Sequence, residues 1–206
     1  MERFDRKKHW ENIYQNKDLQ EVSWYQPVPE TSLDFIEQFK LSKSAKIIDV
    51  GGGDSLLVDH LIDLGYQDIA VLDISEMAID KAKKRLGVLA NKVKWIIADA
   101  AGFKPDCVYD FWHDRAAFHF LTEEEDISNY LNTAQQNLSK NGVLIIGTFS
   151  PQGPSKCSGI EIKQYSEGSM TEKLKCYFDK IRCVEVNHQT PFDTIQSFVF
   201  CSFKKK

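Results

Sequence analysis

The sequence lacks the long hydrophobic run that a membrane-spanning helix needs, which is about 20 apolar residues. A run such as residues 143–146 is far too short. The first eighteen residues are polar and carry both charge signs, and no apolar signal-peptide core follows them. We therefore expect a cytoplasmic protein that does not associate with a membrane.

Cysteine is scarce and has no motif. The five cysteines are widely spaced, and none forms a CxxC or Cys/His pair with zinc-ligand spacing, so we expect no metal site. The simplest interpretation is five reduced thiols, mostly packed in the core, with a special role left open for the loop residue Cys157. The five are Cys107, Cys157, Cys176, Cys183 and Cys201.

Positive charge is also limited. The 26 Lys and Arg residues are outnumbered by 30 Asp and Glu residues, which gives a net charge of −4. A nucleic-acid-binding protein usually presents a basic surface, so a nucleic-acid partner is not expected. Residues 204–206, three lysines, are interpreted as a solvated tail.

The remaining composition is that of a globular protein, with 42% hydrophobic and 27% charged residues, and the length fits one domain. Before residue 42 we expect helices over residues 6–16 and 31–39 with a loop over 21–29 between them. From residue 45 strands alternate with helices, which predicts a mainly parallel sheet covered by helices on both faces. Strands are expected over 46–50, 69–73, 93–98, 109–113, 143–149, 181–187 and 195–203.

Helical patterns fill the gaps between these strands. Thr122 and Glu125 fit a capping box at the start of an amphipathic helix that Asn141 and Gly142 close. A long loop is expected over residues 150–165. The other helices are expected over 55–64, 75–86 and 170–178.

The clearest motif is a strand that runs into three glycines and then a helix, over residues 47–55. Glycines allow a tight turn and a close approach to a ligand, although they also suit a plain connection. The next strand ends in Asp73, an acid at a spacing suited to ribose hydroxyls, or alternatively a helix cap. Ligands of open parallel sheets bind beyond such strand ends.

The details of this turn favour a nucleoside without phosphate. A dinucleotide motif would place a third glycine where Leu56 stands, and a carboxylate at Asp54 would repel a pyrophosphate. No Gly-Lys-Ser/Thr follows, which excludes a P-loop. A nucleoside with a positive group suits the acidic residues better.

At this point the sequence resembles the class I S-adenosylmethionine-dependent methyltransferases. The matching motifs are residues 49–53, 71–75 and 97–100. The resemblance implies a three-layer α/β sandwich, with a seven-stranded, mostly parallel sheet and an antiparallel strand near the C-terminus. It also implies one domain over 1–206, with an N-terminal helical lid over 1–42 and a Rossmann-like catalytic core over 43–206.

The same resemblance assigns the cofactor site. The glycine turn would face the methionine part, Asp73 the ribose, and Asp99 the adenine amino group, although Asp99 could also be a plain loop acid. The expected cofactor-binding set is Asp49, Gly51, Gly52, Gly53, Asp73, Ile74, Asp99, Ala100 and His113.

The segment after the fourth strand, residues 110–120, should lie at the reactive end of the cofactor. His113 or His119 could act as a general base, and Arg115 could pair with a substrate carboxylate. Packing roles for the histidines and an Asp114–Arg115 pair are equally open. Residues 114–117 are similar to the corresponding segment of thiopurine-type methyltransferases.

Aromatic residues before the sheet could close over the site or simply dock a helix on the domain. The expected substrate and lid set is Trp10, Tyr14, Trp24, Tyr25, Arg115, Phe118, Ser158 and Tyr165. We expect methyl transfer to a small molecule by a monomer or homodimer. Alternatives are a protein lysine acceptor and a non-catalytic cofactor-binding module. Base methylation is disfavoured, because no Asn/Asp-Pro-Pro-Tyr/Phe follows the fourth strand.

Overall fold

A computed structural model describes residues 4–206 and contains a seven-stranded sheet in the order β3-β2-β1-β4-β5-β9-β8. Strands β1 to β5 pair with one another in parallel, and β9 is antiparallel to both β5 and β8. The predicted parallel sheet with an antiparallel C-terminal strand is confirmed. Its strands are β1 (Lys46–Val50), β2 (Asp68–Asp73), β3 (Val93–Ile97), β4 (Tyr109–Arg115), β5 (Leu138–Phe149), β8 (Phe178–Gln189) and β9 (Ile195–Lys205).

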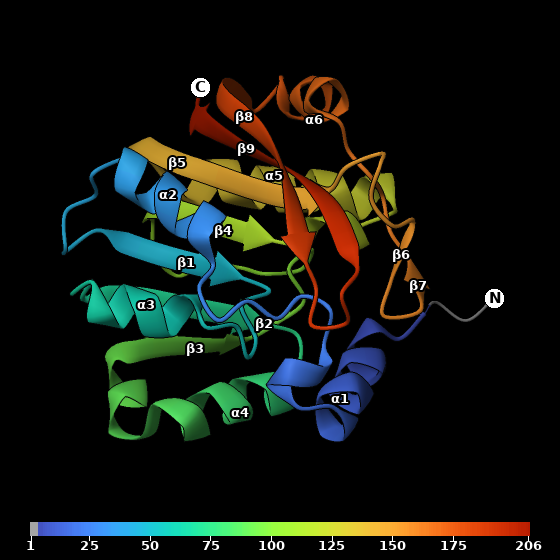
Figure 1. Ribbon diagram of the computed structural model, residues 1–206. Helices are drawn as coiled ribbons and strands as arrows, with labels where there is room; N and C mark the ends of the chain where they lie inside the picture. Colours follow the sequence, from blue (N-terminus) through green and yellow to red (C-terminus); the bar gives the residue numbers. More distant parts are fainter. Residues whose placement is uncertain (1–3) are drawn as a thin grey trace.

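Helices cover both faces of this sheet, which confirms the three-layer architecture (Figure 1). Helices α5 (Glu124–Asn137) and α6 (Glu167–Leu174) pack on one face, with Tyr130 and Met170 fully buried there. Helices α2 (Glu30–Gln38), α3 (Leu57–Asp63) and α4 (Glu76–Leu86) pack on the other. Adjacent strand residues such as Ile47 and Ile48 enter opposite cores, because successive side chains of a strand alternate between faces.

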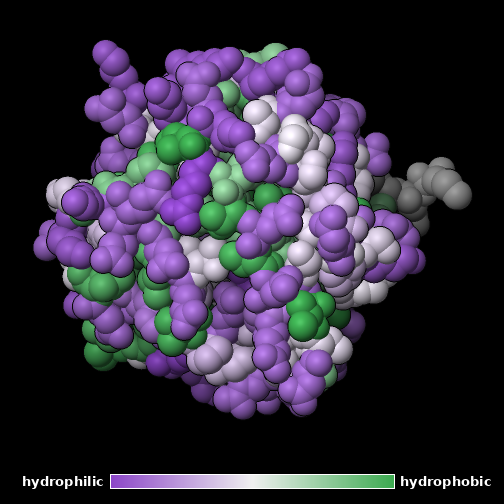
Figure 2. Space-filling view, turned by 45° about the horizontal axis from the view of Figure 1, so that its top comes forward, coloured by the Kyte–Doolittle hydropathy of each residue, from purple (hydrophilic) through white to green (hydrophobic). Residues whose placement is uncertain are grey.

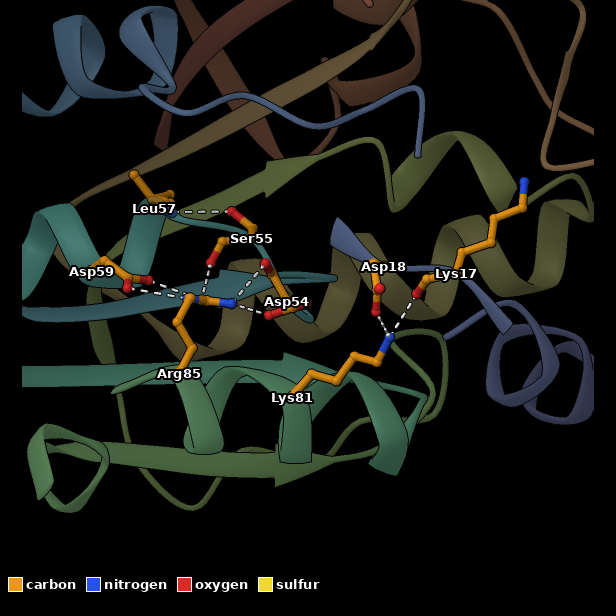
Figure 3. A network of polar contacts seen from close by, with 8 residues as sticks. All are labelled: Lys17, Asp18, Asp54, Ser55, Leu57, Asp59, Lys81 and Arg85. Atoms are coloured by element: carbon orange, nitrogen blue, oxygen red, sulfur yellow. Dashed lines mark hydrogen bonds and ion pairs between the residues drawn. The ribbon is translucent and has the colours of Figure 1, made fainter. Parts of the chain in front are cut away.

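The N-terminal helix α1 (Arg6–Asn16) lies against α4, at the edge of the molecule (Figure 1). Glu11 fastens it there, since its carboxylate accepts hydrogen bonds from the Glu76 and Met77 amides at 2.8 and 3.1 Å. These amides lie at the positive N-terminal end of α4, where a carboxylate is favoured. Lys81 of α4 donates to the Lys17 carbonyl just beyond α1 and pairs with Asp18, before the 3-10 helix η1 (Leu19–Glu21) (Figure 3).

Two details of α5 differ from the sequence-based expectation. The helix begins at Glu124 with Glu123 as its N-cap and no side-chain cap, so the predicted capping box at Thr122 is wrong. The Glu124 carboxylate instead pairs with Lys163 and Lys173, both at 2.7 Å. The helix also ends at Asn137, because Leu138 already pairs with Tyr109 as the first residue of β5.

The segment expected as a loop over 150–165 contains a small hairpin of β6 (Lys156–Cys157) and β7 (Ile160–Glu161). Ser158 and Gly159 form its tip, with φ values of 51° and 82°. Two successive residues with positive φ are typical of the turns that join tight hairpins. Helix α6 starts at Glu167, three residues before the expected start. Elsewhere in the chain, η2 (Gly87–Lys92) and η3 (Phe118–Phe120) are short 3-10 helices.

A disulfide bond joins Cys183 of β8 to Cys201 of β9, so the expectation of five reduced thiols is wrong for these two residues. The cause is strand register, because the two residues are direct cross-strand partners with Cα atoms 4.1 Å apart. Their spacing of 18 residues carries no recognisable motif. Cys107, Cys157 and Cys176 are free thiols.

The surface in Figure 2 is mainly hydrophilic, with hydrophobic side chains in small groups. Exposed apolar side chains include Val88, Phe192 and Ile195. Among residues 4–206, no helix is both long and apolar enough to cross a membrane.

Candidate active site

A cavity opens at the carboxyl ends of the central strands and is roofed by the N-terminal segment. Asp49 and Asp73 reach it from the ends of β1 and β2, Asp99 follows β3, and His113 and Arg115 end β4. The cavity therefore lies where ligands bind in open parallel sheets. Its lining also includes Ile74, Ala98, Ala100, Gly51, Gly52 and the aromatic residues Trp10, Tyr14, Trp24, Tyr25, Phe120, Phe149 and Phe198.

The glycine turn leaves no room for side chains. Gly51 has a φ of 70°, and a Cβ atom there would overlap the Cβ of Ala117. A Cβ atom on Gly52 would lie 2.5 Å from Asp49 Oδ2. Gly53 has a φ of 44°, and a Cβ atom there would lie 2.8 Å from Asp73 Oδ2 and 2.9 Å from the Tyr14 hydroxyl. The turn thus brings bare backbone against the cavity, as close approach to a ligand requires.

Asp73 is a buried carboxyl that lacks a cationic partner. Its Oδ1 accepts a hydrogen bond from the Ser75 amide at 2.8 Å, and no Lys, Arg or His of residues 4–206 forms an ion pair with it. Burial, together with the nearby Asp49 and Glu11 charges, raises the pKa of Asp73 to about 7. Such a group gains most from a ligand that donates hydrogen bonds, such as ribose hydroxyls.

Both carboxylate oxygens of Asp99 have protein partners. Its Oδ1 accepts from the Ala101 amide at 3.0 Å, and its Oδ2 lies 3.0 Å from Arg6 of α1. Arg6 also pairs with Asp126 of α5 at 2.8 Å. The N-terminal helix is therefore tied across the end of the site where the resemblance places adenine.

Asp54 faces away from the cavity. Its carboxylate forms an ion pair with Arg85 of α4, which also binds Asp59 and the Ser55 carbonyl (Figure 3). Asp54 is therefore neutralised and absent from the cavity lining. The expectation that its charge would repel a phosphate is wrong, and only the missing third glycine still disfavours a dinucleotide.

His113 links the site to helix α2. Its Nδ1 lies 2.7 Å from Asp49 Oδ1, and its Nε2 lies 2.9 Å from the Ser32 hydroxyl. All three side chains are buried and line the cavity. Both ring nitrogens are thus occupied by protein groups.

Asp114 and Arg115 do not pair with each other. The Asp114 carboxylate accepts hydrogen bonds from the Ala117 and Phe118 amides and the Tyr130 hydroxyl at 2.7–3.0 Å. Arg115 donates to the Trp24 carbonyl at 3.0 Å, while its Nη2 is buried without a partner.

The structure does not bring four predicted substrate-side residues to the cavity. His119 is fully buried, and its burial near the Arg115 charge lowers its pKa to about 3, so it is neutral at physiological pH. Its Nε2 atom has no partner. Phe118 and Tyr165 pack against each other in the core, and Ser158 forms the hairpin tip. The lining includes none of these four.

The aromatic residues that the sequence predicts for a lid contact one another. The Trp10 ring is 5.8 Å from Trp24 and 5.0 Å from Phe120, in edge-to-face contacts that favour aromatic pairs. Tyr14 packs on Trp24 at 6.2 Å. Trp10, Tyr14, Trp24 and Tyr25 line the cavity as predicted from the sequence.

Several lining residues are not predicted by the sequence patterns, namely Arg6, Ser32, Phe149 and Phe198, whereas Phe120 lies in the predicted segment 110–120. Arg6 and Ser32 carry no motif and reach the site only because their helices fold back over it. Phe198 lies on the last strand, where the order β4-β5-β9 places it near β4. Cys157, for which the sequence leaves a special role open, also lines the cavity.

The proteins that this chain resembles are methyltransferases. A family model described as a methyltransferase domain matches residues 47–142. The chain is 29% identical over 124 residues to the eEF1A lysine and N-terminal methyltransferase of Mus musculus. That match covers 58% of this chain and 17% of the relative, so the chain corresponds to only a small part of that protein.

Solved structures show the same fold. The N-methyltransferase NodS from Bradyrhizobium japonicum, bound to S-adenosylhomocysteine, has a TM-score of 0.72 at 14% identity, covering 98% of this chain and 99% of its own. The 1,6-didemethyltoxoflavin-N1-methyltransferase of Burkholderia thailandensis has a TM-score of 0.71 at 14% identity, with coverages of 95% and 81%. With the methyltransferase-domain match and the cavity at the strand ends, these findings support a class I S-adenosylmethionine-dependent methyltransferase.

Proposed function

We propose that this protein transfers the methyl group of S-adenosylmethionine to a nucleophilic atom of a small-molecule acceptor. The observation that carries the proposal is one cavity with two unlike halves. Asp49, Asp73 and Asp99 line the part next to β1, β2 and β3. Phe120, Phe149 and Phe198 line the part next to β4, β5 and β9. An acidic half suits a cationic nucleoside, and an aromatic half suits a small organic acceptor.

Each residue of the acidic half has a distinct task in this proposal. Asp73 accepts hydrogen bonds from the ribose, and Asp99 binds the adenine amino group. The bare backbone of Gly51 and Gly52 lies against the methionine part, with Ile74, Ala98 and Ala100 around the nucleoside. Gly53, which the sequence also predicts for this site, is absent from the cavity lining. His113 is a positioning residue, because it holds Asp49 through Nδ1 and Ser32 through Nε2.

When bound, the cofactor supplies an electrophilic methyl group on a positively charged sulfur. A bond forms from the acceptor atom to the methyl carbon as the carbon–sulfur bond breaks, and its electron pair stays on sulfur, which leaves S-adenosylhomocysteine. The chain contributes position and the exclusion of water. The Trp10, Trp24 and Phe120 cluster closes the cavity above β4. We propose residues 1–42, of which 4–42 are described, as the lid and 43–206 as the catalytic core.

The relative that acts on lysine and N-terminal residues of eEF1A favours a second candidate, methylation of a protein side chain. The roof over the cavity argues for the smaller acceptor, since α1 is fastened to α4 by Glu11 and to Asp99 and Asp126 by Arg6. A non-catalytic binding module is the third candidate. Cytoplasmic location and the monomer or homodimer state stay predictions.

Two measurements test the proposal. Calorimetry should show binding of S-adenosylmethionine and S-adenosylhomocysteine but not of NAD. A product assay for S-adenosylhomocysteine should then show turnover with a small-molecule library. Binding of NAD alone would overturn the cofactor assignment. Cofactor binding with turnover only on protein substrates would favour the second candidate. Cofactor binding without turnover on small molecules or proteins would favour the third.

A further inference from the structure

Arg115 is a half-buried residue whose guanidinium forms no ion pair with an acidic side chain of residues 4–206. The guanidinium contacts the Trp24 carbonyl at 3.0 Å and the face of Phe198, whose centroid is 5.3 Å from the Arg115 Cζ. The Nη2 atom is buried with no hydrogen-bond partner. A charge removed from water in this way is costly unless something pairs with it.

The neighbouring acidic and thiol groups cannot meet that need. Asp114 is used by two amides and the Tyr130 hydroxyl, and Asp49 is held by His113. Burial raises the pKa of the Cys157 thiol to about 11, so that it is not an anion at neutral pH. The Asp49 charge favours the Arg115 cation from a distance but forms no ion pair with it. A direct counter-charge would therefore come from a molecule that enters the cavity.

The position of the guanidinium places that molecule in the acceptor half. Phe198 belongs to β9, which lies beyond β5 on the side of β4 away from β1. The three acids of the cofactor half come from β1, β2 and the residue after β3, on the opposite side. The Arg115 guanidinium thus lies on the face of Phe198 and near the Cys157 thiol.

We propose that Arg115 binds a carboxylate of the acceptor, which makes the acceptor a small anionic molecule with an apolar, ring-bearing body. This inference rests on the methyl-transfer function proposed above. The planar guanidinium matches a carboxylate, and Nη2 offers the free donors. The walls of Trp10, Trp24, Phe120, Phe149 and Phe198 contact the body of the acceptor.

The test uses pairs of probes of nearly equal size and shape, one anionic and one neutral. They are 4-hydroxy-, 4-amino- and 4-mercaptobenzoate, each with its uncharged benzamide, so that oxygen, nitrogen and sulfur nucleophiles are all offered. Two readouts are measured with each probe. One is the thermal shift of the protein saturated with S-adenosylhomocysteine, and the other is kcat/KM for S-adenosylhomocysteine formation from S-adenosylmethionine.

Arg115→Met is compared with His188→Ala. Arg115 and His188 both hold the loop that carries Trp24. Arg115 contacts the Trp24 carbonyl at 3.0 Å, and His188 contacts the Ser23 carbonyl at 2.7 Å. Loosening the loop lowers binding of both members of a pair equally, whereas loss of anion recognition changes their ratio. We expect the wild type and His188→Ala to prefer benzoates by about tenfold or more, as a charged hydrogen bond implies, and Arg115→Met to show a ratio near one.

A carboxylate could also come from the methionine part of the cofactor, and binding of 5′-methylthioadenosine, which lacks that carboxylate, separates the two sources. If Arg115→Met weakens S-adenosylhomocysteine tenfold but leaves 5′-methylthioadenosine unchanged, the inference is overturned. It is also overturned if the wild type binds S-adenosylhomocysteine yet no benzoate binds better than its benzamide. Failure to bind S-adenosylhomocysteine at all would instead contradict the proposed function.

Discussion

His113 and Asp49 form a buried pair, with Nδ1 and Oδ1 2.7 Å apart, across the adjacent strands β4 and β1. The two residues are direct partners in the strand register, so the sheet itself sets their approach. The Ser32 hydroxyl completes the arrangement from α2. The His113 imidazole thus connects β4, on which it lies, with Asp49 before the glycine turn and with Ser32 of α2.

Replacing His113 with leucine should disturb both stability and cofactor binding. Asp49 and Ser32 would lose buried hydrogen-bond partners, at a cost of about 1–3 kcal/mol for each group. We expect a lower melting temperature in thermal unfolding and at least a tenfold (about 1.4 kcal/mol) weaker affinity for S-adenosylhomocysteine. Ser32→Ala removes only one partner and should have a smaller effect. Equal affinities in His113→Leu and wild type would refute the positioning role.

Gly52→Ala should weaken the cofactor site by steric overlap. The new Cβ would lie 2.5 Å from Asp49 Oδ2 and 2.9 Å from Val71, and His113 prevents Asp49 from giving way. Overpacking of this kind typically costs about 1–3 kcal/mol. Calorimetry with S-adenosylhomocysteine and thermal unfolding would measure both effects. Gly168→Ala in α6 is the matched control, since its nearest contact would be 3.8 Å away, and it should leave binding unchanged.

The Cys183–Cys201 bond should contribute to stability. For a separation of 18 residues, loop closure in the unfolded chain gives about 3 kcal/mol. We expect Cys183→Ser to lower the free energy of unfolding by roughly this amount, and a reductant to lower that of the wild type similarly. Titration of unfolded, unreduced protein should find three thiols, Cys107, Cys157 and Cys176. A titre of five would show that the bond does not form.

The elements that sequence predicts well are those set by local pattern. The strands leading to Gly51 and Asp73 are short apolar runs that end in turn residues, and their positions are confirmed. The strand ends then determine which acids share one edge of the sheet. This is why Asp73, expected from its spacing, and Asp49 and Asp99, expected from the resemblance, line one cavity.

Features that depend on register do not follow from local pattern. Strand β8 extends two residues beyond Asn187, the expected end, to Gln189 opposite Ile195. Had Asn187 faced Ile195, Cys183 would face Val199, and no bond with Cys201 would form. Long-range contacts such as Arg6 with Asp99, or Asp54 with Arg85, likewise have no local pattern, because they depend on how helices pack.

Asp73 makes the cofactor affinity depend on pH. Because its pKa is about 7, Asp73 is mostly protonated below this pH. It must lose that proton before its carboxylate can accept hydrogen bonds from both ribose hydroxyls. The ionised fraction rises about tenfold from pH 6 to pH 8 around such a pKa, and the affinity for S-adenosylhomocysteine should rise by the same factor. Asp73→Asn should bind at least tenfold more weakly at pH 8, with little pH dependence. Calorimetry at both pH values would check this.

The same group should act in the opposite direction on the stability of the ligand-free protein. The folded state keeps the Asp73 proton up to about pH 7, whereas the unfolded chain releases it near pH 4. Because the folded state binds more protons in this window, the contribution of Asp73 to stability falls as the pH rises from 4 to 7. Asp59 and Asp114, whose pKa values burial raises to about 6, act in the same sense. Denaturant unfolding of wild type and Asp73→Asn at pH 5 and pH 8 isolates the contribution of Asp73. The variant should gain stability relative to the wild type at the higher pH, and a difference that does not change with pH would contradict the assignment.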